Sequence, residues 1–146
     1  MEISKIESPS WSEDIKLILL PHSESFEFNE IPDNEPMDLE WWKITNQEGV
    51  TLGVGSIDFR INEFGYFEGE ISLCVSDINK EPNVGSTLLA FLEDECKSRN
   101  TDITSILIKK KNPEYEKVVN WFMNKNYQFE YDFGKDTYWI KNRTVN

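Results

Sequence analysis

The sequence predicts one α/β (α+β) domain over residues 1–146, built on a mostly antiparallel sheet with a single parallel strand–helix–strand crossover. Several short stretches alternate apolar and polar residues, which is typical of strands. Two longer stretches place apolar residues three or four positions apart, which predicts helices. The first of these helices is preceded by one predicted strand and followed by another. Such a strand–helix–strand unit implies that the two strands are parallel and joined by a crossover. The chain is long enough to bury a core without disulfides or metal ions.

The predicted elements follow one another as three strands, a helix, a strand, a second helix and two strands. The turn-like residues 46–49 separate the first two strands, and the third strand alternates apolar and polar side chains. Asn112-Pro113 opens the second helix at a position that tolerates proline. The predicted strands cover residues 39–45, 50–59, 66–75, 104–108, 127–133 and 137–140, and the first helix covers residues 84–98.

Residues 1–40 show a less regular pattern than residues 41–140. A short helix capped by Ser10 or Ser12 fits the first twenty residues, but the continuous apolar positions also fit a strand. Residues 21–40 contain seven acids and three prolines without any Lys or Arg. This composition predicts an irregular or partly helical excursion over the surface.

The charge of the chain restricts its partners. It contains 27 Asp and Glu against 15 Lys and Arg, which gives a net charge of −12 at pH 7. Such a field repels nucleic acid and anionic membranes, and it favours cationic partners. No apolar run approaches the roughly 20 residues that span a bilayer, and the N-terminus lacks the pattern of a signal peptide. We therefore expect a cytoplasmic protein, monomeric or homodimeric.

Metal and disulfide sites are not predicted. Cys74 and Cys96 lie in a strand-like and a helical run, so reduced core thiols are the better interpretation. His22 is the only histidine and lies in an ordinary polar loop. Asp33 and Glu35 lack the spacing of a calcium loop.

Residues 70–89 carry the most specific motif in the chain. An apolar strand ends at Val75, and a loop with the pattern Lys80-x-x-Asn83-x-Gly85 leads into a helix that contains paired leucines. This stretch resembles the central motif of the GNAT superfamily of acyl-CoA N-acyltransferases, which has Arg/Gln-x-x-Gly-x-Gly/Ala. Residues 112–127 resemble the Asn-opened helix of the family, and residues 49–53 its glycine-containing hairpin. The resemblance covers residues 41–140, which it implies form the core, with residues 1–40 as a variable segment on the acceptor side.

The resemblance implies a GNAT-like fold with helices on both faces of the sheet and acetyl-CoA as the acyl donor. In the family, pyrophosphate lies at the start of the helix after the loop, and pantetheine runs alongside the strand that ends at Val75. The N-terminus of a helix suits an anion because its first amides are unpaired and its dipole is positive there. The expected cofactor-binding residues are Leu73, Val75, Lys80, Asn83, Val84, Gly85, Ser86 and Asn112.

Four departures from the family pattern bear on activity. Asn83 replaces a glycine, although Asn tolerates left-handed backbone conformations. Glu81 adds a negative charge to the loop, and Pro82 removes one backbone donor. Phe122 stands where many members have the tyrosine that protonates the departing thiolate of CoA.

The resemblance also suggests where an amine acceptor would react. The family often places a glutamate on the strand before the loop, and Glu70 or Glu68 could take the proton of the amine. Strand parity puts both on the face opposite Ile71, where they could equally be solvent-facing residues. Trp41 and Trp42 should face opposite sides, with one lining the acceptor cleft or both in the core.

Three functions remain open on the sequence. The first is N-acetyl transfer to a cationic small molecule or a lysine side chain, with the acidic residues 21–40 on the acceptor side either attracting the amine or forming only a solvated loop. The second is a catalytically inactive GNAT-like binding or inhibitory protein that recognises a basic protein through its acidic surface. The third is an acidic interaction domain unrelated to this family.

Overall fold

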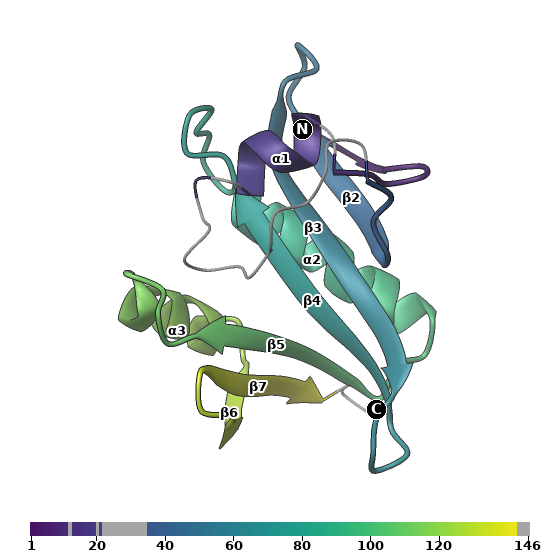
Figure 1. Ribbon diagram of the computed structural model, residues 1–146, viewed down its shortest axis with the longest axis vertical. Helices are drawn as coiled ribbons and strands as arrows, with labels where there is room; N and C mark the ends of the chain where they lie inside the picture. Colours follow the sequence, from purple (N-terminus) through teal and green to yellow (C-terminus); the bar gives the residue numbers. More distant parts are fainter. Residues whose placement is uncertain (12, 20, 22–34, 143–146) are drawn as a thin grey trace.

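The computed structural model describes residues 1–11, 13–19, 21 and 35–142. Within these ranges seven strands form one sheet, in the order β1-β2-β3-β4-β5-β7-β6. Three helices pack on it (Figure 1). The elements are β1 (Glu2–Lys5), α1 (Glu13–Leu19), β2 (Glu40–Thr45), β3 (Thr51–Ile61), β4 (Phe67–Val75), α2 (Val84–Ser98), β5 (Ile103–Lys109), α3 (Tyr115–Asn124), β6 (Gln128–Asp132) and β7 (Asp136–Asn142).

The sheet confirms the predicted topology. Every pair of neighbouring strands is antiparallel except β4 and β5, which are parallel and joined through α2. This parallel pair is short, because Glu68, Gly69 and Glu70 of β4 are the residues registered with β5. Beyond Glu70 the two strands diverge, and Figure 1 shows them spreading apart towards α3. The sheet is therefore open in its middle.

Helices cover both faces of the sheet, as the resemblance implied. On one face, α1 contributes Ile15 to a buried cluster that includes Trp41 and Val54. On the other, α2 contributes its apolar stripe to a cluster that includes Trp42, and α3 packs against the edge of that cluster. Trp41 and Trp42 are 8% and 3% exposed. They face opposite sides as predicted, and both are core residues.

Two glycines allow α2 to lie close to the sheet. A Cβ atom added to Gly55 of β3 would lie 2.7 Å from the Leu92 side chain. One added to Gly69 of β4 would lie 2.6 Å from the Cys96 sulfur. Cys74 and Cys96 are both buried free thiols, as predicted. Within the described ranges, no helix is long and apolar enough to cross a membrane.

The N-terminal segment departs most from the prediction. The helix in the first twenty residues is confirmed as α1, but the strand β1 was not predicted. Ser10, one of the two candidate helix caps, instead forms an isolated antiparallel bridge with Pro36. The other candidate cap, Ser12, lies outside the described residues. The same is true of His22, of Asp33 and of residues 22–34 of the acidic stretch.

Candidate functional site

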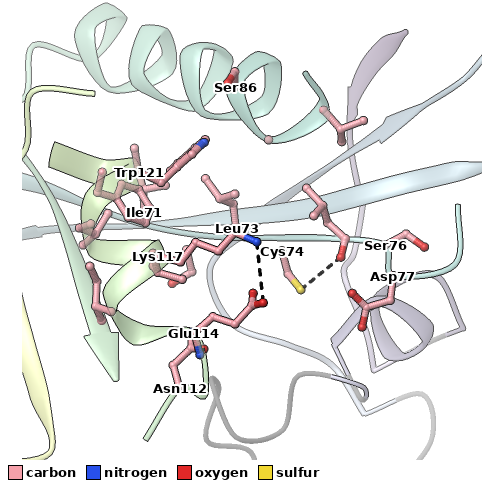
Figure 2. Close-up of a pocket in the computed structure, with 18 of the residues that line it drawn as sticks. Ile71, Leu73, Cys74, Ser76, Asp77, Ser86, Asn112, Glu114, Lys117 and Trp121 are labelled. Atoms are coloured by element: carbon pink, nitrogen blue, oxygen red, sulfur yellow. Dashed lines mark hydrogen bonds and ion pairs between the residues drawn. The ribbon is translucent and has the colours of Figure 1, made fainter. Parts of the chain in front are cut away.

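A cavity of about 740 Å³ lies where β4 and β5 diverge. We call it the wedge cavity. Side chains from the diverging parts of both strands line it, together with the loop after β4, the first turn of α2 and one face of α3. In Figure 2, Trp121, Ile71 and Leu73 lie between Ser86 of α2 and Lys117 of α3.

The structure brings all eight expected cofactor-binding residues to the wedge cavity. They come from three places that are separated in sequence: the end of β4, the loop with the first turn of α2, and the segment before α3. Their ability to bind acetyl-CoA remains a prediction. The eight are Leu73, Val75, Lys80, Asn83, Val84, Gly85, Ser86 and Asn112.

The N-terminus of α2 has the properties of an anion site. Asn83 caps the helix with φ 65°, in the left-handed region that its side chain tolerates. The amide of Thr87 donates to the carbonyl of Asn83 at 2.9 Å, so the three amides before it have no partner inside the helix. This first turn contains no acid, although the chain has 27. The positive end of the dipole is therefore unopposed by the helix itself.

Glu81 in the loop is less unfavourable for binding an anion than the sequence suggests. The Glu81 carboxylate accepts a hydrogen bond from the Asn46 amide nitrogen at 3.3 Å, which ties it to the turn between β2 and β3. Glu81 still lines the cavity, but three lysines and three acids balance each other there. The charged lining residues are Lys80, Lys109, Lys117, Asp77, Glu81 and Glu114. Among the residues that the structure describes, the lining of the wedge cavity is thus neutral, within a chain of net charge −12.

Two residues of α3 at the site, Lys117 and Trp121, were missed in the sequence. Lys117 and Trp121 both line the wedge cavity, and Figure 2 shows Trp121 extending from α3 towards α2. Lys125 donates to the Ser86 hydroxyl at 3.0 Å, and its ammonium lies 5.3 Å from the centre of the Trp121 ring. The spacing 117, 121, 125 is one helical stripe, which was available as a signal.

No tyrosine lines the wedge cavity among the described residues. Phe122 lines it at the position discussed above. The Tyr127 hydroxyl donates to Glu93 at 2.8 Å. Burial and the charge of Glu93 raise the pKa of the Tyr127 hydroxyl well above its ordinary value. Tyr131 lines a different cavity. The structure therefore offers no tyrosine as proton donor at this site.

A second cavity, also of about 740 Å³, lies on the sheet beside the paired part of β4 and β5. We call it the sheet-face cavity. Glu68 and Glu70 both line it, and Arg60 joins them: its guanidinium donates to Glu68 at 3.1 Å and to Glu70 at 3.0 Å. Leu107 of β5 lines both cavities. This residue therefore borders both cavities.

The two glutamates differ in accessibility. Glu68 is 1% exposed, and it also accepts hydrogen bonds from Ser105 at 2.5 Å and Asn62 at 3.1 Å. Burial raises the pKa of Glu68, but these hydrogen bonds and the charge of Arg60 outweigh it, so the net pKa is lowered. The Glu70 side chain is 21% exposed. Glu68 therefore holds its neighbours in place, and Glu70 is the better candidate for a base.

Solved structures give the fold of the chain. Smu.2055 from Streptococcus mutans aligns with a TM-score of 0.71 and 12% identity, over 97% of this chain and 99% of its own. A protein from Klebsiella pneumoniae assigned as an acyl-CoA N-acyltransferase aligns with a TM-score of 0.69 and 21% identity, over 97% and 96%. The ribosomal-protein-alanine N-acetyltransferase from Brucella melitensis aligns with a TM-score of 0.58 and 19% identity, over 72% of this chain and 69% of its own.

These likenesses show the fold alone, because the sequence identities are low. No protein-family model matches the chain, and no curated protein matches it by sequence. The protein has the fold of the GNAT acyl-CoA N-acyltransferases. The parallel pair that opens into the wedge cavity is the element of this fold that the site depends on.

Proposed function

We propose that this protein is an N-acetyltransferase that moves the acetyl group of acetyl-CoA to the amine of a cationic small molecule or of a lysine side chain. The observation that carries the proposal is the wedge cavity, which joins an acid-free helix N-terminus to an open strand edge. The GNAT fold of the chain supports acyl transfer in general. The chain's own residues support the choice of donor and acceptor.

The wedge cavity supplies both kinds of contact that an acyl-CoA needs. The first turn of α2 offers the unpaired amides of Val84, Gly85 and Ser86, and Lys80 adds a positive charge beside them. Past Glu70, the edge of β4 that faces β5 is not registered with a strand in the described structure. Its amide and carbonyl groups can therefore bind the amides of an extended pantetheine chain, as an added strand would.

The chemistry requires a neutral amine and an activated acyl group. Acetyl-CoA supplies the acyl group as a thioester. Glu70 would accept the proton of the amine, directly or through a water molecule. Arg60 would fix the position of Glu70, and Glu68 would fix Arg60 through a buried set of hydrogen bonds. With Phe122 in place of a tyrosine, the thiolate would take its proton from solvent.

Charge supports a cationic acceptor. The chain carries a net charge of −12, which attracts cations and disfavours nucleic acid or an anionic membrane as a partner. The buried free thiols Cys74 and Cys96 fit a reducing compartment such as the cytoplasm. We propose a monomer or a homodimer, with no metal ion required.

A second candidate is a binding or inhibitory protein with this fold but without catalysis. The observations that favour it are Glu81 and Pro82 in the loop and the lack of a tyrosine in the described lining of the wedge cavity. This candidate shares the acidic surface and would recognise a basic protein. It predicts that acetyl-CoA either does not bind or binds without turnover on any amine.

Calorimetry with acetyl-CoA and CoA tests the donor, and thiol release with a panel of amines tests the reaction. We expect micromolar binding and release of CoA that depends on the amine. Burial raises the pKa of Cys74 and Cys96 to about 12, so the protein's own thiols should react slowly with the thiol reagent. Glu70→Gln should keep acetyl-CoA binding and lose turnover, while Glu48→Gln in the exposed turn before β3 should change neither. Failure of acetyl-CoA to bind the native chain would contradict the proposal.

A further inference from the structure

The sheet-face cavity has an exposed apolar rim. Ile61, Phe64, Tyr66 and Phe133 line it and are between 52% and 72% exposed. Leu107, which borders both cavities, is also exposed. Single exposed apolar side chains are ordinary on a protein surface, but a group of them around one cavity indicates a binding surface.

One side chain, that of Asn62, holds both the rim and Glu68 in place. The Asn62 side-chain oxygen accepts hydrogen bonds from the amides of Phe64 at 2.9 Å and Tyr66 at 3.0 Å. The nitrogen of the same amide group donates to Glu68 at 3.1 Å. One asparagine therefore links the aromatic turn to the buried carboxylate. The turn is preorganised, which lowers the entropy cost of binding a ligand against it.

Part of the lining is a packed group of aromatic rings that includes Phe133 of the rim. The centroid of the Tyr131 ring lies 4.6 Å from that of Phe133 and 4.9 Å from that of Tyr138. Tyr138 is buried at the base of this group, while Phe133 reaches solvent. Such a wall presents ring faces and edges to a ligand, which suits an aromatic ring, a bulky apolar group or a cation.

The cavity is negatively charged. Its lining contains, among the described residues, five acids and one base, Arg60, which is already paired with Asp58, Glu68 and Glu70. Burial raises the pKa of the Tyr131 hydroxyl, and the charges of nearby acids raise it further. The surplus charge favours a cation. The five acids are Glu63, Glu68, Glu70, Asp102 and Glu130.

We propose that the acceptor is a primary amine attached to an aromatic or bulky apolar group, with the amine at Glu70 and the apolar group against the rim. This inference rests on the proposed acetyl transfer and narrows its acceptor. Leu107 borders both cavities, so an amine in the sheet-face cavity would lie beside a residue that also lines the wedge cavity. Polyamines and lysine side chains would use the acids but leave the rim in water.

Two sources could supply this chemistry, and the assay should include both. A free arylalkylamine is represented by 2-phenylethylamine, and a peptide N-terminus by the tripeptide amide Phe-Ala-Ala. Spermidine and Nα-acetyl-lysine amide represent cations without the apolar group, and 2-phenylethanol represents the ring without the charge. We expect kcat/KM for one aromatic amine to exceed that for spermidine by at least about 10-fold.

Variants test the rim directly. Phe64→Ser removes a ring that is 72% exposed, so it should leave folding unchanged. It should raise KM for 2-phenylethylamine or Phe-Ala-Ala by about 2- to 10-fold, without affecting spermidine. Phe129→Ser is the matched control, because Phe129 is 52% exposed and does not line the cavity. An equal loss for both variants, or for both classes of amine, would contradict the inference.

Direct binding separates this inference from the proposed function. Chemical-shift changes on titration of 2-phenylethylamine without acetyl-CoA should map to Tyr66, Tyr131 and Phe133, and 2-phenylethanol should bind more weakly. If acetyl-CoA binds and spermidine or lysine is the preferred acceptor, the inference is wrong while acetyl transfer stands. If the aromatic amine binds at these residues and acetyl-CoA does not bind at all, the proposed transfer is wrong while the site stands.

Discussion

A negative charge added to the first turn of α2 should weaken acetyl-CoA binding without lowering the stability of the fold. Ser86→Asp places a carboxylate in this turn, which contains no acid in the native chain. Ser86 lines the wedge cavity and accepts a hydrogen bond from Lys125 at 3.0 Å. The new carboxylate should keep Lys125 as its partner. It should also oppose any phosphate bound at the same helix end.

The added charge should raise the stability of the helix and lower the affinity for acetyl-CoA. An acid in the first turn of a helix stabilises it by about 0.3–1 kcal/mol, which corresponds to a rise in Tm of about 1–4 °C for a chain of this size. Two like charges about 5 Å apart repel by about 3 kcal/mol at an effective dielectric constant of about 20. Lys125 offsets part of this repulsion. A remaining 2 kcal/mol, to order of magnitude, weakens acetyl-CoA binding by about 30-fold.

Calorimetry with acetyl-CoA and thermal unfolding together check the prediction. Thr87→Asp is the matched control, because it adds the same charge to the same turn at an exposed residue that does not line the cavity. We expect both variants to unfold at or above the native temperature and only Ser86→Asp to lose affinity. Equal affinities in both variants and the native chain would refute the assignment of phosphate to the N-terminus of α2.

Three further predictions concern two departures from the family pattern and the ion pair between Glu40 and Arg99. Phe122→Tyr should raise kcat by about 10-fold or more at unchanged acetyl-CoA affinity if protonation of the thiolate limits turnover; unchanged kcat would show that another step does. Glu81→Gln should tighten acetyl-CoA binding several-fold, with Glu48→Gln as the control, because it removes a carboxylate that lines the wedge cavity; no change would place the phosphates away from the loop. The Arg99 guanidinium lowers the pKa of Glu40 to about 2, so the ion pair should contribute its full stability above about pH 4.5 and lose it as the pH falls towards 2. Urea unfolding of Glu40→Gln should show a loss of about 1 kcal/mol at pH 7 that shrinks at pH 2.5, and a loss independent of pH would contradict this sign.

The local features of the fold were readable from the sequence. The apolar stripe of α2 and the alternation of β4 follow from the 3.6- and 2-residue periods of the backbone. Asn83 was expected to tolerate a left-handed conformation, and it has φ 65°. The parallel crossover followed from the order of elements alone. Each of these depends on residues close together in the chain.

The strand β1 and the position of β7 were not readable in this way. β1 has four residues and pairs with β2 across about forty positions of sequence. β7 lies between β5 and β6, so the last strand of the chain pairs with β5 and the strand before it lies at the edge of the sheet. Both depend on hydrogen bonds between distant segments, which periodicity does not encode.

The sequence predicted the fold class and the parallel crossover, and the family resemblance pointed to eight of the residues that line the wedge cavity. The folded structure was needed to locate the point where β4 and β5 separate, since this depends on a parallel pairing that ends at Glu70. It also decided the environments of the two glutamates: Arg60 pairs with both, but burial and further hydrogen bonds occupy Glu68 and leave Glu70 more accessible. Spacing fixes which side chains share a face, whereas burial and ion pairs depend on neighbours that the chain brings together only when it folds.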